Sequence, residues 1–85
     1  MNTPKTSTQD VLYTLIAEGS VSIMEFAYLS GFRTRISNLK LKYGLKLRTE
    51  MQKGMNKFGR VYKYHRHYII DKEQAIKIYN KMQEN

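Results

Sequence analysis

The sequence predicts a small, mainly α-helical domain that carries one β-hairpin. Three observations support this fold class. Apolar residues recur at helical spacing in four segments, alternate with charged residues over 45–50, and give way to a β-branched and aromatic run over 61–70. The 85 residues suffice for one hydrophobic core and not for two, so we expect a single domain spanning 1–85.

The first helix is predicted at 7–18. Thr6 and Gln9 have the spacing of a capping box, in which a hydroxyl and a residue three positions later satisfy the free amides of a helix start. Gly19 marks the end of the helix. The apolar residues between these signals fall on one helical face: Val11, Leu12, Leu15 and Ile16. Val21, which follows, is predicted as no more than a single-bridge strand.

A second and a third helix are predicted at 22–29 and 34–43. Ser22 and Glu25 form another capping box, and the second helix ends in the tight break at 30–32. Thr34 can cap the third helix, which a glycine follows. The inward face of the third helix carries three apolar residues at helical spacing: Ile36, Leu39 and Tyr43.

Two strands and a last helix complete the expected order. The strands are predicted at 45–50 and 61–70, joined by a glycine- and lysine-containing turn region that is too long for a tight hairpin loop. Asp71 and Gln74 then cap a helix at 72–82. The sequence thus predicts three helices, a two-stranded hairpin and a C-terminal helix.

The distribution of charge points to a polyanionic partner. The chain has 15 Lys and Arg against 7 Asp and Glu, a net charge of +8. The surplus lies in residues 33–66, which hold eleven basic residues and one acidic residue, Glu50. A positive segment of this kind attracts nucleic acid, whereas charge that serves solubility alone would be scattered.

The predicted helices at 22–29 and 34–43, separated by a short glycine-containing turn, have the anatomy of a helix-turn-helix. In that motif the second helix enters the major groove of DNA. Arginine can contact guanine or phosphate, asparagine can pair with adenine, and serine and lysine suit the sugar-phosphate backbone. The residues of the third helix that we expect to bind DNA are Arg33, Thr34, Arg35, Ser37, Asn38, Lys40 and Lys42.

The predicted hairpin adds a second basic element. Its tip, over 51–60, is a cationic segment that no hydrophobic core requires, and we expect it to lie along the flanking DNA backbone or in the minor groove. The residues of this segment that we expect to bind nucleic acid are Lys53, Asn56, Lys57 and Arg60.

The stretch from Thr34 to Glu50 resembles the winged helix-turn-helix domain common in bacteriophage and prophage proteins. The resemblance rests on a basic and apolar helix pattern, a glycine and a strand ending in Thr-Glu, namely Arg35, Ile36, Leu39, Lys40, Gly44, Leu47, Thr49 and Glu50. Residues 59–64 resemble the return strand of that family. The helix after Ile70 and the long stretch over 62–68 depart from the pattern. The resemblance implies a phage-encoded transcriptional regulator or accessory factor that binds double-stranded DNA.

Several other classes of function lack the residues that they need. The chain has no cysteine, and His65 and His67 alone are too few ligands for a closed zinc site. No catalytic triad, phosphate-binding glycine loop or carboxylate cluster is present, so we expect no enzyme, no cofactor and no small-molecule substrate. No apolar run is long enough to span a membrane, and the first ten residues do not resemble a signal peptide. We therefore expect a cytoplasmic protein, in the host cytosol if phage-encoded, with no membrane partner.

The last predicted helix is the candidate for self-association. Its apolar stripe is narrow, and Ile78 falls on its flank, where it would be exposed if the helix only docked on its own domain. We therefore expect a homodimer through 72–82 that binds an inverted repeat. The alternative, in which Ile76 and Tyr79 only close the core of the domain, stays open.

Two other classes of function stay open. One is an RNA-binding module that uses the basic and aromatic strand over 60–68. The other is a phage inhibitor that binds a host protein, although occupation of a nucleic-acid channel would favour acidic mimicry and this chain is basic.

Overall fold

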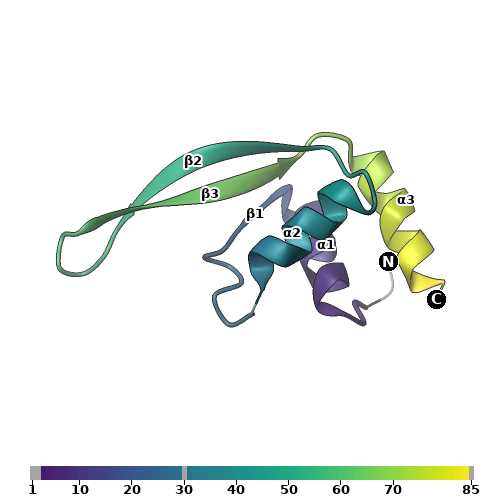
Figure 1. The fold of residues 1–85 in the computed structure, drawn as a ribbon, viewed down its shortest axis with the longest axis horizontal. Helices are drawn as coiled ribbons and strands as arrows, with labels where there is room; N and C mark the ends of the chain where they lie inside the picture. Colours follow the sequence, from purple (N-terminus) through teal and green to yellow (C-terminus); the bar gives the residue numbers. More distant parts are fainter. Residues whose placement is uncertain (1–2, 30, 85) are drawn as a thin grey trace.

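The computed structural model describes residues 3–29 and 31–84. In this part of the chain three helices and three strands follow one another as α1 (Ser7–Glu18), β1 (Ser20–Ser22), α2 (Phe32–Leu41), β2 (Leu47–Met55), β3 (Val61–Ile69) and α3 (Lys72–Gln83). The strands form one antiparallel sheet in the order β1-β3-β2 (Figure 1). This is an α+β fold, so the prediction of a mainly α-helical winged helix-turn-helix domain with a two-stranded wing is wrong.

The helix predicted at 22–29 is the main error. One of the two predicted capping contacts forms, because the Glu25 carboxylate accepts a hydrogen bond from the Ser22 amide. The Ser22 hydroxyl donates to the same carboxylate and accepts from the Met24 amide, not from that of Glu25. The backbone bonds that follow, however, join residues three apart, with N···O distances of 3.2, 3.1 and 2.9 Å, and the segment is a series of turns. Among residues 23–29 only Phe26 is buried, so packing offers little to offset the cost of nucleating a helix over so few residues.

The chain before these turns joins the sheet. Ser20, Val21 and Ser22 pair with Tyr68, His67 and Arg66 of β3, so β1 is a full third strand and not a single bridge. Its central residue, Val21, is completely buried in the core. The predicted helix-turn-helix is consequently absent from the described residues, because α2 has a strand and turns before it in place of a partner helix.

Helix α2 begins two residues before the predicted 34–43 and ends at Leu41. Its first residue, Phe32, is buried and stacks on Phe26 with ring centroids 5.5 Å apart. Gly31 supplies the left-handed backbone (φ 81°) that turns the chain into the helix. Thr34 therefore lies in the first turn of α2 and does not cap it.

The hairpin is longer and tighter than predicted. Leu45 is buried, and its amide donates to the carbonyl of Leu39 before the strand begins, so β2 runs from Leu47 to Met55 and not over 45–50. The residues between 52 and 59 do not form an open turn region. The Asn56 side-chain oxygen accepts hydrogen bonds from the amides of Phe58 (2.9 Å) and Arg60 (3.0 Å), and this closes a short loop at the tip.

The predicted helices at 7–18 and 72–82 are confirmed, because α1 spans Ser7–Glu18 and α3 spans Lys72–Gln83. Both N-caps use the predicted local signals, with Thr6 accepting from the Gln9 amide and Asp71 from that of Gln74. The core lies between these helices, α2 and the base of the sheet: Val11, Leu12, Leu15, Ile16, Val21, Phe26, Phe32, Ile36, Leu39, Leu45, Ala75, Tyr79 and Met82.

Helix α3 belongs to this core. Ala75 and Tyr79 are fully buried, and the Tyr79 ring lies 5.8 Å from that of Tyr13 on α1. Ile78 is half-buried and packs against the same cluster. The exposed flank from which a homodimer through 72–82 was predicted is therefore not present, and the homodimer stays a prediction without that support.

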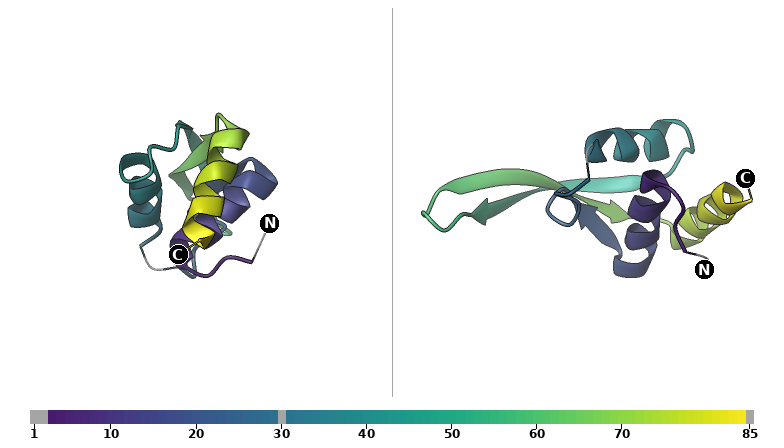
Figure 2. Two further views of the ribbon diagram at one scale, coloured as in Figure 1. Left: turned by 90° about the vertical axis from the view of Figure 1, so that its right-hand side faces the viewer. Right: turned by 90° about the horizontal axis from the view of Figure 1, so that it is seen from below.

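The molecule is elongated because the hairpin projects from one end. Its principal extents are 46 × 23 × 21 Å, and the tip of β2 and β3 lies at the end opposite α3 (Figures 1 and 2). Strand β1 pairs with β3 only as far as Arg66. Beyond that point β2 and β3 continue as a two-stranded ribbon, which we call the arm (residues 51–65).

Candidate nucleic-acid interface

The arm carries most of its side chains in solvent. Its five residue pairs run from Met51 opposite His65 to Met55 opposite Val61, a length of roughly 16 Å at about 3.3 Å per residue. A ribbon with only two strands and no core beneath it contributes little to the stability of a domain. The residues of the arm are therefore not needed for stability, so their chemical character indicates what the arm binds.

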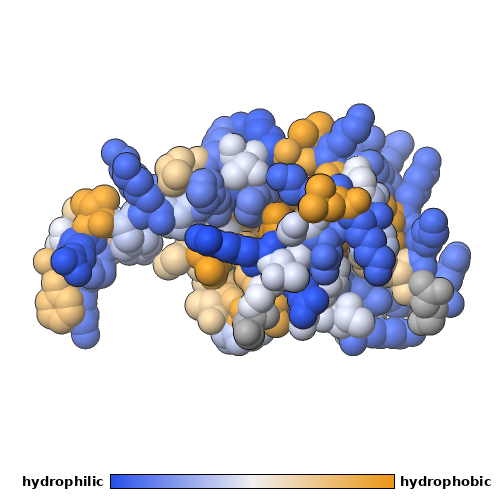
Figure 3. All heavy atoms as spheres, viewed as in Figure 1, coloured by the Kyte–Doolittle hydropathy of each residue, from blue (hydrophilic) through white to orange (hydrophobic). Residues whose placement is uncertain are grey.

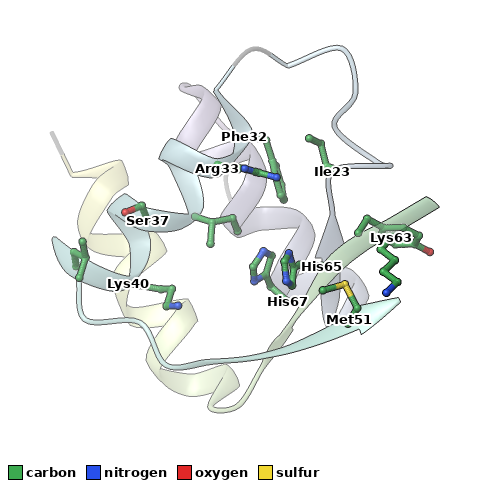
Figure 4. Close-up of a pocket in the computed structure, with 12 residues that line it drawn as sticks. Ile23, Phe32, Arg33, Ser37, Lys40, Met51, Lys63, His65 and His67 are labelled. Atoms are coloured by element: carbon green, nitrogen blue, oxygen red, sulfur yellow. The ribbon is translucent and has the colours of Figure 1, made fainter. Parts of the chain in front are cut away.

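A groove of about 550 Å³ lies between α2 and the base of the arm (Figure 4). Phe32 and Arg33 enter it from α2, His65 and His67 lie between the two elements, and Lys63 stands on the arm side. The other described residues that line it are Ile23, Ile36, Ser37, Lys40, Leu41, Met51 and Tyr64. No carboxylate is among these described residues, so the groove combines an apolar floor with a basic rim.

The predicted contact residues of α2 divide between two flanks. Because successive residues are rotated by about 100°, Arg33, Ser37 and Lys40 fall on the flank that faces the arm, and all three line the groove. Arg35, Asn38 and Lys42 fall on the opposite flank. Thr34 lies on the outermost surface between the two flanks, beside Leu41, which is 84% exposed. The structure thus brings three of the seven predicted α2 residues into the groove and leaves four outside it.

The far flank of α2 is less available to a partner. Arg35 and Asn38 are half-buried, and the buried Nε of Arg35 has no hydrogen-bond partner among the described residues. Lys42 follows the helix and lies with its Nζ 5.5 Å from the centre of the Tyr43 ring. These side chains face away from the arm.

The predicted residues of the hairpin are all exposed, and they lie on or beside the tip. Lys53 is on β2, Lys57 lies in the loop, and Arg60 lies at the end of the loop. Asn56 has a structural role, because its side-chain oxygen already accepts two backbone hydrogen bonds that close the loop. Three of these four residues therefore remain as candidate contacts through their side-chain charge.

Lys63 and His65 are candidate contacts that the sequence analysis did not assign to the DNA-binding surface. Lys63 lies directly opposite Lys53 in the ladder, so the two ammonium groups share one face of the arm. Like charges directly opposite each other destabilise a strand pair. A polyanion bound along this face would relieve that repulsion. Only the strand register reveals the pair, since the prediction ended the first strand at 50.

Arg66, in contrast, anchors the base of the arm to the rest of the domain, which we call the body (α1, α2, α3 and the base of the sheet). Its guanidinium donates to Glu25 (2.6 Å), to the Ser20 hydroxyl (3.1 Å) and to the Ser22 hydroxyl (3.3 Å). Burial opposes ionisation of Glu25, but hydrogen bonds from Ser22 and Arg66 outweigh it and hold the pKa of this carboxyl below its ordinary value. The Arg66 guanidinium is therefore occupied by contacts within the protein, although the residue lies in the basic segment over 33–66.

The single acidic residue of the basic segment is also neutralised. Glu50 accepts from Arg48 in an ion pair, on the face of the ribbon opposite to the groove. The Arg48 guanidinium also lies 4.5 Å from the centre of the Tyr68 ring. Among the described residues, the groove and the tip of the arm therefore present cations that no carboxylate pairs.

His67 sits where α2, β1 and the hairpin meet. Its Nδ1 is 2.9 Å from the Thr49 hydroxyl, and its ring lies 6.2 Å from that of Phe32. Burial, with the nearby charges of Lys40 and His65, holds the pKa of His67 below its ordinary value.

Within residues 3–29 and 31–84 no cluster of three metal-ligating side chains occurs.

The tyrosines of β3 are largely engaged within the protein. The Tyr68 hydroxyl accepts a hydrogen bond from the side-chain amide of Gln52 (3.3 Å), and the Arg48 guanidinium covers the Tyr68 ring. The Tyr62 ring lies across Gly54, where an added Cβ would come within 2.3 Å of it. Tyr62 and Tyr64 also contact each other, with centroids 6.0 Å apart. These contacts reduce the ring surface available to stack on bases.

Comparison of the chain with protein-family models, curated proteins and solved structures finds no match. In the described part of the chain, no helix combines the length and the apolar character needed to cross a bilayer.

Proposed function

We propose that the protein binds double-stranded DNA through the exposed face of α2 and the adjoining arm. The observation that carries this proposal is a basic surface that holds no carboxylate among the described residues. It runs from α2 across the groove to the tip of the arm through Arg33, Lys40, Lys63, Lys53, Arg60 and Lys57.

The shape of this surface suits a duplex. An α-helix fits into the major groove, which is about 12 Å wide, and the outer surface of α2 offers Thr34 and Ser37 for hydrogen bonds there. The arm, roughly 16 Å long, would then follow the adjacent backbone toward the minor groove. The groove between α2 and the arm would hold the sugar-phosphate strand that separates the two DNA grooves, with Lys40 and Lys63 on its two sides.

The biological role we propose is that of a sequence-specific transcriptional regulator or accessory factor, phage-encoded as the resemblance over 34–50 implies. The support for this role is that resemblance, part of which lies on α2. The engaged tyrosines make the RNA-binding alternative weaker, because Tyr68 and Tyr62 are covered on one side.

The test is the salt dependence of duplex binding, measured by fluorescence anisotropy. If the six cations named above contact phosphates, log K against log salt has a slope of about −5. Lys40→Ala and Lys63→Ala should each make the slope shallower by about 0.9. Lys77→Ala, which removes an exposed charge from α3 at the other end of the molecule, is the matched control and should change nothing.

Three outcomes would overturn the proposal. One is a slope near zero, which would remove the electrostatic basis of the interface. A second is an equal loss for Lys77→Ala and Lys63→Ala, which would show that binding follows net charge and not this surface. The third is a single-stranded RNA of equal length that competes more strongly than the duplex.

A further inference from the structure

The loop at the tip of the arm exposes a large aromatic side chain. Phe58 is 83% exposed, and Met55 and Val61, the last residue pair of the ribbon, are 65% and 55% exposed beside it. The space-filling view shows apolar residues gathered with basic ones at this end of the molecule (Figure 3). No core lies near enough to explain an apolar tip there, since the hydrophobic cluster is at the base of the sheet.

The backbone of the loop is built to present this side chain. Asn56 closes the loop through its two hydrogen bonds to the amides of Phe58 and Arg60, and Gly59 adopts the left-handed conformation (φ 79°) directly after the phenylalanine. These constraints fix the loop without using the Phe58 ring. The ring therefore stands out from a hydrogen-bonded turn at the end of a projecting arm.

Cations surround the apolar tip. The Lys57 Nζ lies 5.2 Å from the centre of the Phe58 ring, Arg60 ends the loop, and the Lys53 and Lys63 pair lies two residue pairs behind Met55 and Val61 along the ribbon. An exposed apolar side chain with basic residues near it suits a partner in which stacked aromatic rings lie between two rows of phosphates. A base-pair step of duplex DNA has this arrangement.

We infer that Phe58 is a wedge that inserts between two base pairs and kinks the duplex, with Lys57, Arg60 and the Lys53 and Lys63 pair on the flanking phosphates. This inference rests on the proposed function, and it adds that the protein deforms DNA. Phenylalanine and methionine side chains inserted from the minor groove unstack a step and bend DNA by about 20–90°. Pyrimidine–purine steps such as TpA unstack most easily, so the wedge should prefer them.

The experiment uses a short G·C-rich duplex with one central TpA step, in which 2-aminopurine replaces the adenine and the two ends carry a fluorescent donor and acceptor. The whole chain at saturation should raise the 2-aminopurine fluorescence several-fold and shorten the end-to-end distance. Phe58→Ala should abolish both signals while its affinity falls by less than about tenfold, because the cost of unstacking is avoided together with the gain. Phe58→Leu, which keeps an apolar wedge, should retain part of both signals.

Lys57→Ala is the matched control for charge at the tip. It should weaken binding and leave both signals unchanged at saturation, because the ring remains. Since Phe58 is exposed in a loop held by Asn56, its substitutions should leave the thermal midpoint unchanged, and that measurement separates loss of the wedge from loss of the fold.

A wild-type chain that binds the duplex without unstacking or bending it would overturn the wedge and leave the proposed function standing. A chain that binds no duplex would overturn both. If Phe58→Ala instead abolished binding to vesicles of anionic lipid and left the DNA signals unchanged, the tip would be a membrane-inserting element and the inference would be wrong.

Discussion

The body of the protein and its arm place their apolar residues in opposite ways. In the body, α1, α2, α3 and the base of the sheet enclose a core in which Leu12, Leu39 and Tyr79 are completely buried. In the arm, Met51, Met55 and Phe58 are more than half exposed. Burial of apolar surface is the main source of stability, so the body holds the fold together and the arm is available for a partner.

The two regions also differ in how they treat charge. The arm meets the body at Arg66 and Glu25, a place that we call the joint. These two residues form an ion pair that is partly shielded from solvent. In the arm, Lys53 and Lys63 face each other across the ladder with no carboxylate on that face among the described residues. Such a pair does not stabilise the fold, which agrees with the role in binding that we propose for the arm.

The largest expected effect tests the body. Tyr79→Ala removes a fully buried ring from α3 and should lower the free energy of unfolding by about 3–5 kcal/mol, a large fraction of the stability of a small domain. Urea denaturation followed by circular dichroism measures it. Lys57→Ala in the arm should change the same quantity by no more than about 0.5 kcal/mol. A cost below about 1 kcal/mol for Tyr79→Ala would show that α3 is not part of the core.

A smaller effect tests the joint. Arg66→Ala removes the hydrogen bonds to Glu25, Ser20 and Ser22 and should cost about 1–2 kcal/mol in the free energy of unfolding. Because the two residues act as a pair, Glu25→Gln added to Arg66→Ala should cost less than the sum of the single changes.

The same variant separates anchoring from binding. At equal folded fraction, Arg66→Ala should leave the salt slope of duplex binding unchanged. A slope that became shallower by a full unit would show that Arg66 contacts phosphate and that the joint is part of the interface.

The smallest expected effect is the pH dependence of the free energy of unfolding that His67 causes at the base of the arm. Burial and the charges of Lys40 and His65 lower the pKa of His67 in the folded state, so the unfolded chain takes up the proton at a higher pH. Stability should therefore fall as pH is lowered through the ordinary histidine value of about 6.5. The lowered pKa of Glu25 acts only below its ordinary value of 4.5, outside this window.

The measurement is the urea midpoint between about pH 7.5 and about pH 5.5. The wild-type midpoint should decrease over this interval, and His67→Gln should flatten the decrease. His65→Gln changes an exposed histidine of the same strand and should retain most of it. A wild-type midpoint that rises on acidification would contradict the buried placement of His67.

Some features follow from the sequence by itself because their causes are local. The capping signals at Thr6 and Asp71 predict the starts of α1 and α3, and the apolar stripes between them and the helix ends predict which residues are buried. The β-branched and aromatic run of β3 likewise predicts a strand, since such residues suit a pleated backbone. Charge is a sum over residues and needs no structure, so the basic segment over 33–66 is visible directly.

The tertiary structure decided the rest, because the causes lie far apart in the chain. Ser22 and Glu25 satisfy a helix-capping pattern, yet pairing of β1 with β3 and the contact of Glu25 with Arg66 hold that segment as a strand and turns. The division of α2 into two flanks depends on which side the arm passes. The juxtaposition of Lys53 with Lys63 and the exposure of Phe58 depend on a register that ends in a tight loop at Asn56. Pairing and packing of this kind are decided by contacts between distant residues, and a single segment does not contain them.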